Sequence, residues 1–129
     1  MAAIKRGDIY YVDFSPVEGH EQSGVRPAVV MSANHINVED LGLAFVIPGT
    51  TAAQVDPGTN EVLADVVRVE PSRENGLKQV TYFLCSQLRA VSLKRLTTPR
   101  TRVGILTDNN LYNLEEIVIA LLDLGPKDE

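Results

Sequence analysis

Polar side chains that could do chemistry are concentrated in one short stretch, GHEQSGVRP, at residues 19–27. His20, Glu21, Gln22 and Arg26 stand there between glycines and a proline, with apolar sequence on both sides. An arginine keeps its charge at any working pH, and its planar fork matches a phosphate. A histidine titrates near neutrality and can move a proton. The alternatives are a salt bridge from Arg26 to an acid such as Glu21, and ordinary loop polarity for the others.

A second polar element, PGTT at Pro48–Thr51, follows an apolar run. It places the hydroxyls of Thr50 and Thr51 beside a glycine that lets a ligand approach the backbone. Ordinary turn chemistry would use the same residue types. Together with Arg26 and His20, these hydroxyls suit transesterification of RNA, in which the ribose 2′-OH attacks its own phosphate. The enzyme then needs no nucleophile of its own, only donors aimed at the developing charge and groups that move protons.

Other common catalytic motifs are absent. With two histidines, His20 and His35, and one cysteine, the chain has no paired ligands at structural-zinc spacing, and HEQSG is not HExxH. There is no GxxxxGK[ST], GxGxxG or GxSxG. We therefore predict a reaction without metal or cofactor. Cys85 is interpreted as a small buried hydrophobe.

Composition and charge favour one domain over residues 1–129, since 44% of the residues are hydrophobic. The net charge is −5, yet residues 78–107 contain no acid. This run is either a phosphate-contacting surface or a solvated strand edge. Its basic residues are Lys78, Arg89, Lys94, Arg95, Arg100 and Arg102. No apolar run approaches the ~20 residues of a membrane span, and no signal-peptide core precedes residue 12. We expect a cytoplasmic protein without membrane contact.

Periodicity predicts a mainly β chain that ends in a helix. Alternating or continuous apolar runs predict strands at 7–14, 26–33, 43–49, 61–70 and 78–91. The third strand is expected to end at Pro48-Gly49. Apolar residues at helical spacing over 111–122 predict a C-terminal helix that is capped by Thr107 or Asp108 and stops at Gly125-Pro126. A compact antiparallel sheet that closes into a small, partly open barrel would leave few free edges.

Three segments, in order along the chain, resemble the MazF/PemK/Kid toxins of bacterial toxin–antitoxin systems. RGDIYYVDFSPVEGHEQSGVRPAVVMSAN at 6–34 is similar to their N-terminal signature, and this match is specific. VIPGTTAAQ at 46–54 resembles their V-x-P-x-T element, and CSQLRAVSLKRL at 85–96 resembles their C-D-Q element. The amphipathic C-terminal helix also agrees with the family.

The resemblance implies an SH3-like barrel of the CcdB/PemK/MazF type with a C-terminal helix. It also implies a homodimeric, metal-independent endoribonuclease that cuts single-stranded RNA, mostly mRNA, at specific sequences. Such enzymes leave 2′,3′-cyclic phosphate and 5′-hydroxyl ends. A cognate, MazE-like antitoxin neutralises them by laying a disordered tail across the dimer and its RNA groove.

The resemblance also assigns roles by position. It makes Arg26 and Thr50 catalytic, with His20 as an acid–base residue of the Kid-like branch that is serine in many MazF-like members. It assigns substrate-side or RNA-groove positions to Glu21, Gln22, Thr51, Gln87 and Arg89. Kid-like toxins carry R-C-D-Q where this chain has Leu84–Gln87, LCSQ, so their second Arg and Asp are missing. That departure favours the Arg26 and Thr50 scheme.

Two alternatives from other classes stay open at this stage. One is a non-enzymatic poison like the gyrase-binding CcdB branch, which acts through an aromatic-containing C-terminal tail. This chain ends in DLGPKDE and has no Trp. The other is a family member that has lost activity and serves as a binding module. Cleavage of RNA in the presence of a chelator would separate both from a nuclease.

Overall fold

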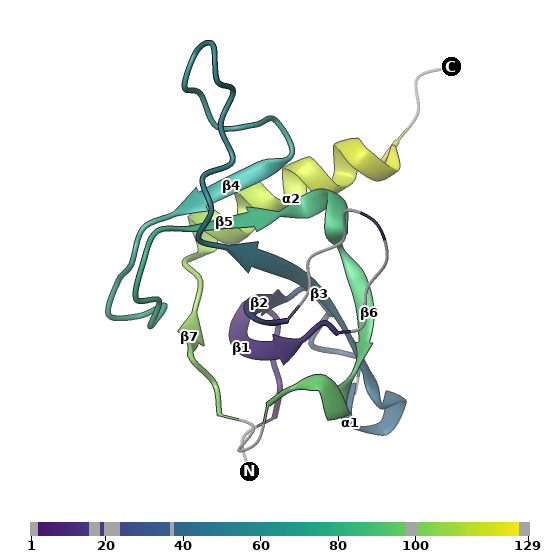
Figure 1. Cartoon of the computed structure of the whole chain (residues 1–129). Helices are drawn as coiled ribbons and strands as arrows, with labels where there is room; N and C mark the ends of the chain where they lie inside the picture. Colours follow the sequence, from purple (N-terminus) through teal and green to yellow (C-terminus); the bar gives the residue numbers. More distant parts are fainter. Residues whose placement is uncertain (1–2, 16–18, 20–23, 37, 98–100, 127–129) are drawn as a thin grey trace.

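The protein is a curled antiparallel sheet covered by one long helix (Figure 1). The computed structural model describes residues 3–15, 19, 24–36, 38–97 and 101–126. Its strands are β1 (Asp8–Asp13), β2 (Val25–Val30), β3 (Leu43–Thr50), β4 (Val66–Val69), β5 (Thr81–Leu84), β6 (Arg89–Ser92) and β7 (Gly104–Ile105). The helices are α1 (Val38–Leu41) and α2 (Asp108–Leu122), with 3₁₀ turns η1 (Cys85–Gln87) and η2 (Leu93–Arg95). The prediction of a mainly β, partly open barrel with a C-terminal helix is confirmed.

The sheet runs in the order β4-β5-β3-β2-β1-β7, and β6 pairs with the first half of β3. Both faces of the central strands are buried. Val12, Ala28 and their neighbours fill the inside of the curl, whereas Ile9 and Val29 pack against the layer that contains α2. Successive strand residues point to opposite faces, so a near-continuous apolar run suits a strand buried on both sides. The second half of β2, Ala28–Val30, is buried in this way, which explains its continuous apolar sequence.

The third strand continues through Pro48 and Gly49 to Thr50, so the prediction that it ends at Pro48-Gly49 is wrong. At this point β3 pairs with β2 on one side and β5 on the other. A Cβ on Gly49 would lie 2.6 Å from Thr81 Cγ2, closer than carbon atoms can pack. The glycine therefore serves the close approach of β5 to β3, and it does not mark a turn.

The two later strands are shorter than predicted. Of residues 61–70 only Val66–Val69 form a strand, and Val62 makes an isolated bridge with Val55 instead. The predicted strand at 78–91 is two strands, β5 and β6, separated by η1. β5 pairs with the end of β3 and β6 with its beginning, so the chain must turn between them. This turn contains no Gly or Pro, so the sequence pattern does not indicate it.

Helix α2 begins where predicted, because Thr107 Oγ1 accepts a hydrogen bond from Asn110 N at 3.1 Å as the N-cap. Its predicted stop at Gly125-Pro126 is too late. Asp123 adopts a left-handed conformation with φ 53°, and its N–H bonds back to Ala120 O. A short polar side chain tolerates that conformation, so the helix ends at Leu122. In the described ranges, no helix is long and apolar enough to cross a membrane.

Candidate active site

The strand register brings Arg26 and Thr50 together. β2 and β3 pair with Ala28 opposite Pro48, so the same register continued by two residues places Arg26 opposite Thr50. The two side chains then point to the same face. Arg26 Nη1 lies 3.5 Å from Thr50 Oγ1, and the N–H is directed at that oxygen. Residues that are 24 apart in the sequence thus form one cationic, hydroxyl-bearing pair.

The surroundings of this pair bury the hydroxyl and leave Arg26 partly exposed. Thr50 is 4% exposed, and its Oγ1 also accepts from Ala52 N at 3.2 Å. Arg26 is half-buried, and the neighbouring Thr51 is exposed. A guanidinium and a hydroxyl held side by side at a strand end are donors suited to a phosphate.

Three predicted site residues, His20, Glu21 and Gln22, lie outside the described residues. The chain on both sides of them is well anchored. Phe14 N donates to Gly24 O at 3.0 Å, and Gly24 N donates to Ser15 Oγ at 3.1 Å. These bonds join the two ends of the β1–β2 connection at Phe14, Ser15 and Gly24, and we call this junction the β1–β2 neck. It lies two residues from Arg26.

Arg95 adds a long-range tie to this neck. Its Nη1 donates to the backbone carbonyls of Asp13, at 3.2 Å, and of Ser15. In the sequence, Arg95 stands out only as one member of the basic run. No sequence signal connects it to residues about 80 positions earlier, because the curl of the sheet makes the contact.

The two predicted RNA-groove residues have different settings. The Arg89 guanidinium carbon lies 5.7 Å from the centre of the Phe14 ring, within the range of a cation–π contact. Phe14 is on the same strand face as Val12, the register partner of Arg26, so Arg89 lies at the same end of the sheet. Gln87 is half-buried at the end of η1.

Some residues of the basic run make structural contacts, and others line a hollow on the surface. Arg95 holds the neck, whereas Lys78 and Arg102 line a hollow of about 350 Å³ together with Tyr11. Arg102 Nη1 also lies 3.6 Å from Oδ1 of the buried Asp8. The run is therefore more than a solvated edge, since part of it surrounds a concave surface beside an exposed aromatic ring.

Cys85 is 1% exposed, and burial is the first cause that raises the pKa of its thiol to about 12. A thiol in that environment stays protonated and packs as an apolar group, which confirms the interpretation made from the sequence. Within the described ranges, no group of three or more His, Cys, Asp or Glu side chains could hold a metal ion.

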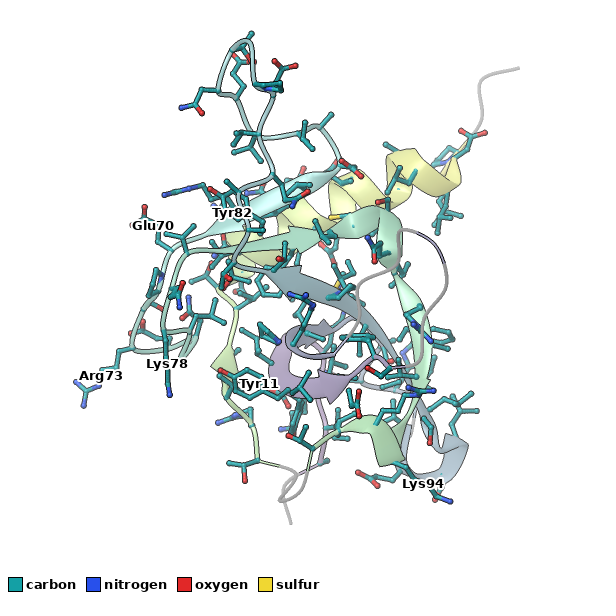
Figure 2. All side chains as sticks on the ribbon, in the orientation of Figure 1. Tyr11, Glu70, Arg73, Lys78, Tyr82 and Lys94 are labelled. Atoms are coloured by element: carbon teal, nitrogen blue, oxygen red, sulfur yellow. The ribbon has the colours of Figure 1, made fainter. Side chains whose placement is uncertain are left out.

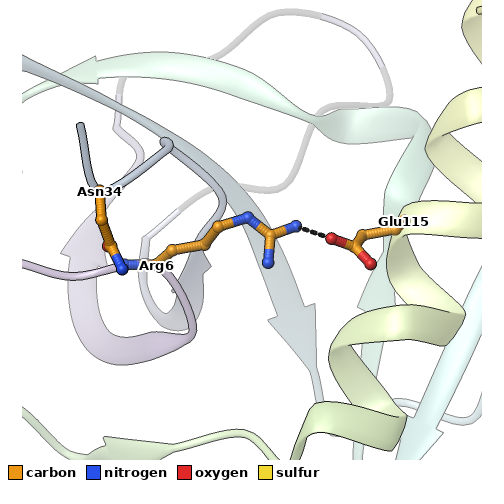
Figure 3. Close-up of polar contacts among 3 residues, drawn as sticks. All are labelled: Arg6, Asn34 and Glu115. Atoms are coloured by element: carbon orange, nitrogen blue, oxygen red, sulfur yellow. Dashed lines mark hydrogen bonds and ion pairs between the residues drawn. The ribbon is translucent and has the colours of Figure 1, made fainter. Parts of the chain in front are cut away.

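A second surface lies beside α2. Arg6 forms an ion pair with Glu115 of the helix, and its backbone N–H donates to Asn34 Oδ1 at 2.7 Å (Figure 3). Next to this pair is a mostly apolar hollow of about 540 Å³, where Phe45 and Tyr112 are 42% and 57% exposed. Exposed apolar surface around a hollow is typical of an interaction face.

Comparison with known proteins decides the family. The model of the family described as PemK-like, MazF-like toxin of type II toxin–antitoxin system matches residues 5–122. The chain belongs to this toxin family. It is 31% identical over 120 residues to the endoribonuclease EndoA of Bacillus subtilis (strain 168), covering 93% of this chain and 97% of that protein. It is 29% identical over 123 residues to the endoribonuclease MazF of Staphylococcus epidermidis, covering 95% and 93%.

Solved structures agree with the MazF-like fold. MazF from Deinococcus radiodurans matches with a TM-score of 0.75 at 23% identity, over 96% of this chain and 100% of that chain. An endoribonuclease in complex with its cognate antitoxin from Mycobacterial species matches with a TM-score of 0.70 at 18% identity, over 97% and 100%. At these identities the matches show the fold alone. The toxin family inferred from the sequence motifs is confirmed.

Proposed function

We propose that this MazF-like chain is an endoribonuclease toxin that cuts single-stranded RNA, chiefly mRNA, and is neutralised by a cognate antitoxin. The observation that carries the proposal is the contact between Arg26 and Thr50 at the strand ends of a chain from this family. Two curated relatives of nearly the same length are named endoribonucleases. The gyrase-poison alternative is not favoured, because the relatives are named nucleases and the Arg26–Thr50 pair is present.

The proposed reaction is an internal transesterification. The substrate's 2′-oxygen loses its proton and forms a bond to phosphorus, while the bond from phosphorus to the 5′-oxygen breaks. The products are a 2′,3′-cyclic phosphate and a 5′-hydroxyl, and the leaving 5′-oxygen takes up a proton. Arg26 and Thr50 would donate to the phosphoryl oxygens as their negative charge grows, which is where such donors lower a barrier most. His20 would assist the proton transfers, whereas Arg26 keeps its charge and stabilises the phosphoryl oxygens.

Substrate binding would use residues around this pair. We place Thr51, Gln87 and Arg89 along the RNA path, with Glu21 and Gln22 organising the loop that leads to Arg26. Support comes from the exposure of Thr51 and from the position of Arg89 against Phe14 at the same end of the sheet. Phosphate contacts position RNA, whereas base contacts from the loops would select the sequence.

Partners and location complete the proposal. A MazE-like antitoxin would bind the toxin, as the cognate antitoxin does in the similar Mycobacterial structure. We also propose a homodimer, which the apolar hollow beside α2 supports, and a cytoplasmic location, where mRNA is found.

One experiment tests the activity. The purified protein and its Arg26→Ala variant are incubated with a long single-stranded RNA in excess EDTA, and fragment ends are mapped. Discrete cuts with cyclic-phosphate and 5′-hydroxyl ends, lost in the variant while its melting curve is kept, are the expected result. No cuts on several RNAs would refute the nuclease and favour a binding module. An unfolded variant would show that Arg26 serves mainly as a salt bridge.

A further inference from the structure

The register that pairs Arg26 with Thr50 continues across two more strands. Thr50 lies opposite Tyr82 of β5, and Tyr82 lies opposite Arg68 of β4. Directly opposed residues of antiparallel strands share a face. Arg26, Thr50, Tyr82 and Arg68 therefore form one row across four strands, which we call the cross-sheet row.

Burial confirms that the outer half of this row shares one face. Along β4, Val66 and Val67 are buried, Arg68 is exposed and Val69 is buried. Val66 and Tyr82 belong to one small apolar cluster, which Val55 and Val80 cover in part. Arg68 is two residues from Val66 on the same strand, so it emerges from the rim of this cluster.

Arg68 is held in place without being buried. Its Nη1 donates to Glu70 Oε1 at 2.9 Å, and its side chain is 40% exposed. Hydrogen bonds to Glu70 first, and then to the side chain of Tyr82, raise the pKa of Arg68. Figure 2 shows Tyr82 and Glu70 at this edge of the sheet. The tyrosine, 9% exposed, acts as a fixed support that directs the guanidinium.

The distances suit a single RNA strand. Neighbouring strands are about 5 Å apart, so the backbones of Thr50 and Arg68 are separated by about 10 Å. Successive phosphates of one strand lie at least ~3.4 Å apart, so this gap spans at most about three nucleotides. The row thus presents guanidinium groups at both ends, with the Thr50 hydroxyl next to the first.

We propose that Arg68 binds a phosphate of the RNA a few nucleotides from the scissile phosphate, so that the cross-sheet row is the path of the substrate. This inference rests on the proposed nuclease function. Tyr82 is a positioning residue, and Glu70 is a competitor that the phosphate displaces. Displacement is feasible because the Glu70 side chain is 69% exposed and surface ion pairs are weak.

The competition by Glu70 separates binding from a structural role. If the Arg68–Glu70 pair only stabilised the fold, Glu70→Gln would weaken the protein or change nothing. If Arg68 binds phosphate, Glu70→Gln frees the guanidinium and removes a negative charge from the path. RNA affinity should then rise by about two- to fivefold.

The test measures binding and turnover separately. The binding probe is an RNA oligonucleotide that contains the mapped cleavage site with a 2′-deoxy residue at the scissile position, which cannot be cut. Arg68→Ala is expected to weaken its binding about tenfold. The slope of log affinity against log salt should fall by about 0.7, the value of one phosphate contact on a single strand. KM should rise while kcat changes little, and Arg68→Lys should restore most of the slope.

The matched control is Arg73→Ala, the same charge change at an exposed position of the loop between β4 and β5, outside the row (Figure 2). The proposal would be overturned if Arg68→Ala and Arg73→Ala agreed within twofold in RNA affinity and in salt slope. Weaker binding by Glu70→Gln would also overturn it, as would a loss of kcat and melting temperature in Arg68→Ala with KM unchanged. If the wild-type protein cuts no RNA, the proposed function fails; if it cuts and Arg68→Ala matches the control, only this inference fails.

Discussion

Replacing Thr50 by valine should remove turnover while leaving the fold nearly intact. Valine keeps the shape of the side chain and removes Oγ1, which accepts from Ala52 N at 3.2 Å and lies 3.5 Å from Arg26 Nη1. Ala52 is exposed, so water can satisfy its N–H. Two hydrogen bonds to Oγ1 are lost, and the one from Arg26 is long at 3.5 Å, so the stability cost should be about 1–2 kcal/mol. Loss of one donor to the developing charge should lower kcat about 10²- to 10³-fold, or roughly 3–4 kcal/mol.

Thr81→Val is the matched control. Thr81 is 2% exposed, close to the 4% of Thr50, and its Oγ1 donates to Gln79 O at 3.0 Å. Its side chain faces Gly49, on the other side of the sheet from the cross-sheet row. Thr81→Val should therefore cost a similar ~1 kcal/mol of stability and leave kcat unchanged. Thr50→Ser keeps the hydroxyl and should retain kcat within about tenfold.

The assay combines melting curves with single-turnover cleavage of a short RNA that contains the mapped site, in EDTA. The reasoning requires that Thr50→Val and Thr81→Val melt alike and differ in rate by at least about 10². A Thr50→Val rate within tenfold of wild type would show that the hydroxyl takes no part in the chemistry. Equal rate losses in both valine variants would mean that turnover follows stability.

Four further outcomes are expected. Gly76→Ala should lower the free energy of unfolding by about 2–4 kcal/mol, because φ is +65° and a Cβ would lie 2.1 Å from a backbone carbonyl oxygen. Gly42→Ala, with φ +76° and open space around the added Cβ, should lower it by only about 1 kcal/mol. Denaturant titrations measure both changes. The Cys85 thiol, with its pKa raised to about 12, should resist iodoacetamide at pH 8 until the protein unfolds. Because the unfolded thiol ionises near its ordinary value of 9.0, unfolding free energy should fall as pH rises above that value. His20→Ser should retain substantial cleavage activity, and complete loss in the same RNA assay would give His20 an essential acid–base role.

The apolar pattern of the sequence located most of the fold. Alternation around Tyr10 and the continuous apolar run around Val29 predicted β1 and β2, because side-chain direction along a strand follows the local period. A cap at Thr107 or Asp108 predicted the start of α2, and the structure has Thr107 as the cap. The failures lie where tertiary contacts override local signals. Gly49 continues a strand because β5 passes close to it, and η1 breaks an apolar run that shows no turn residue.

The sequence by itself determined the kinds of groups available for chemistry and the family to which the chain belongs, because residue types and their order are read directly. It could not determine which groups meet. The contact of Arg26 with Thr50 and the extension of the row to Arg68 depend on the register of paired strands, and the tie from Arg95 to the β1–β2 neck depends on the curl of the sheet. Register is fixed only when the strands pair and bury their apolar faces, since a shift of one residue would turn every side chain to the opposite face.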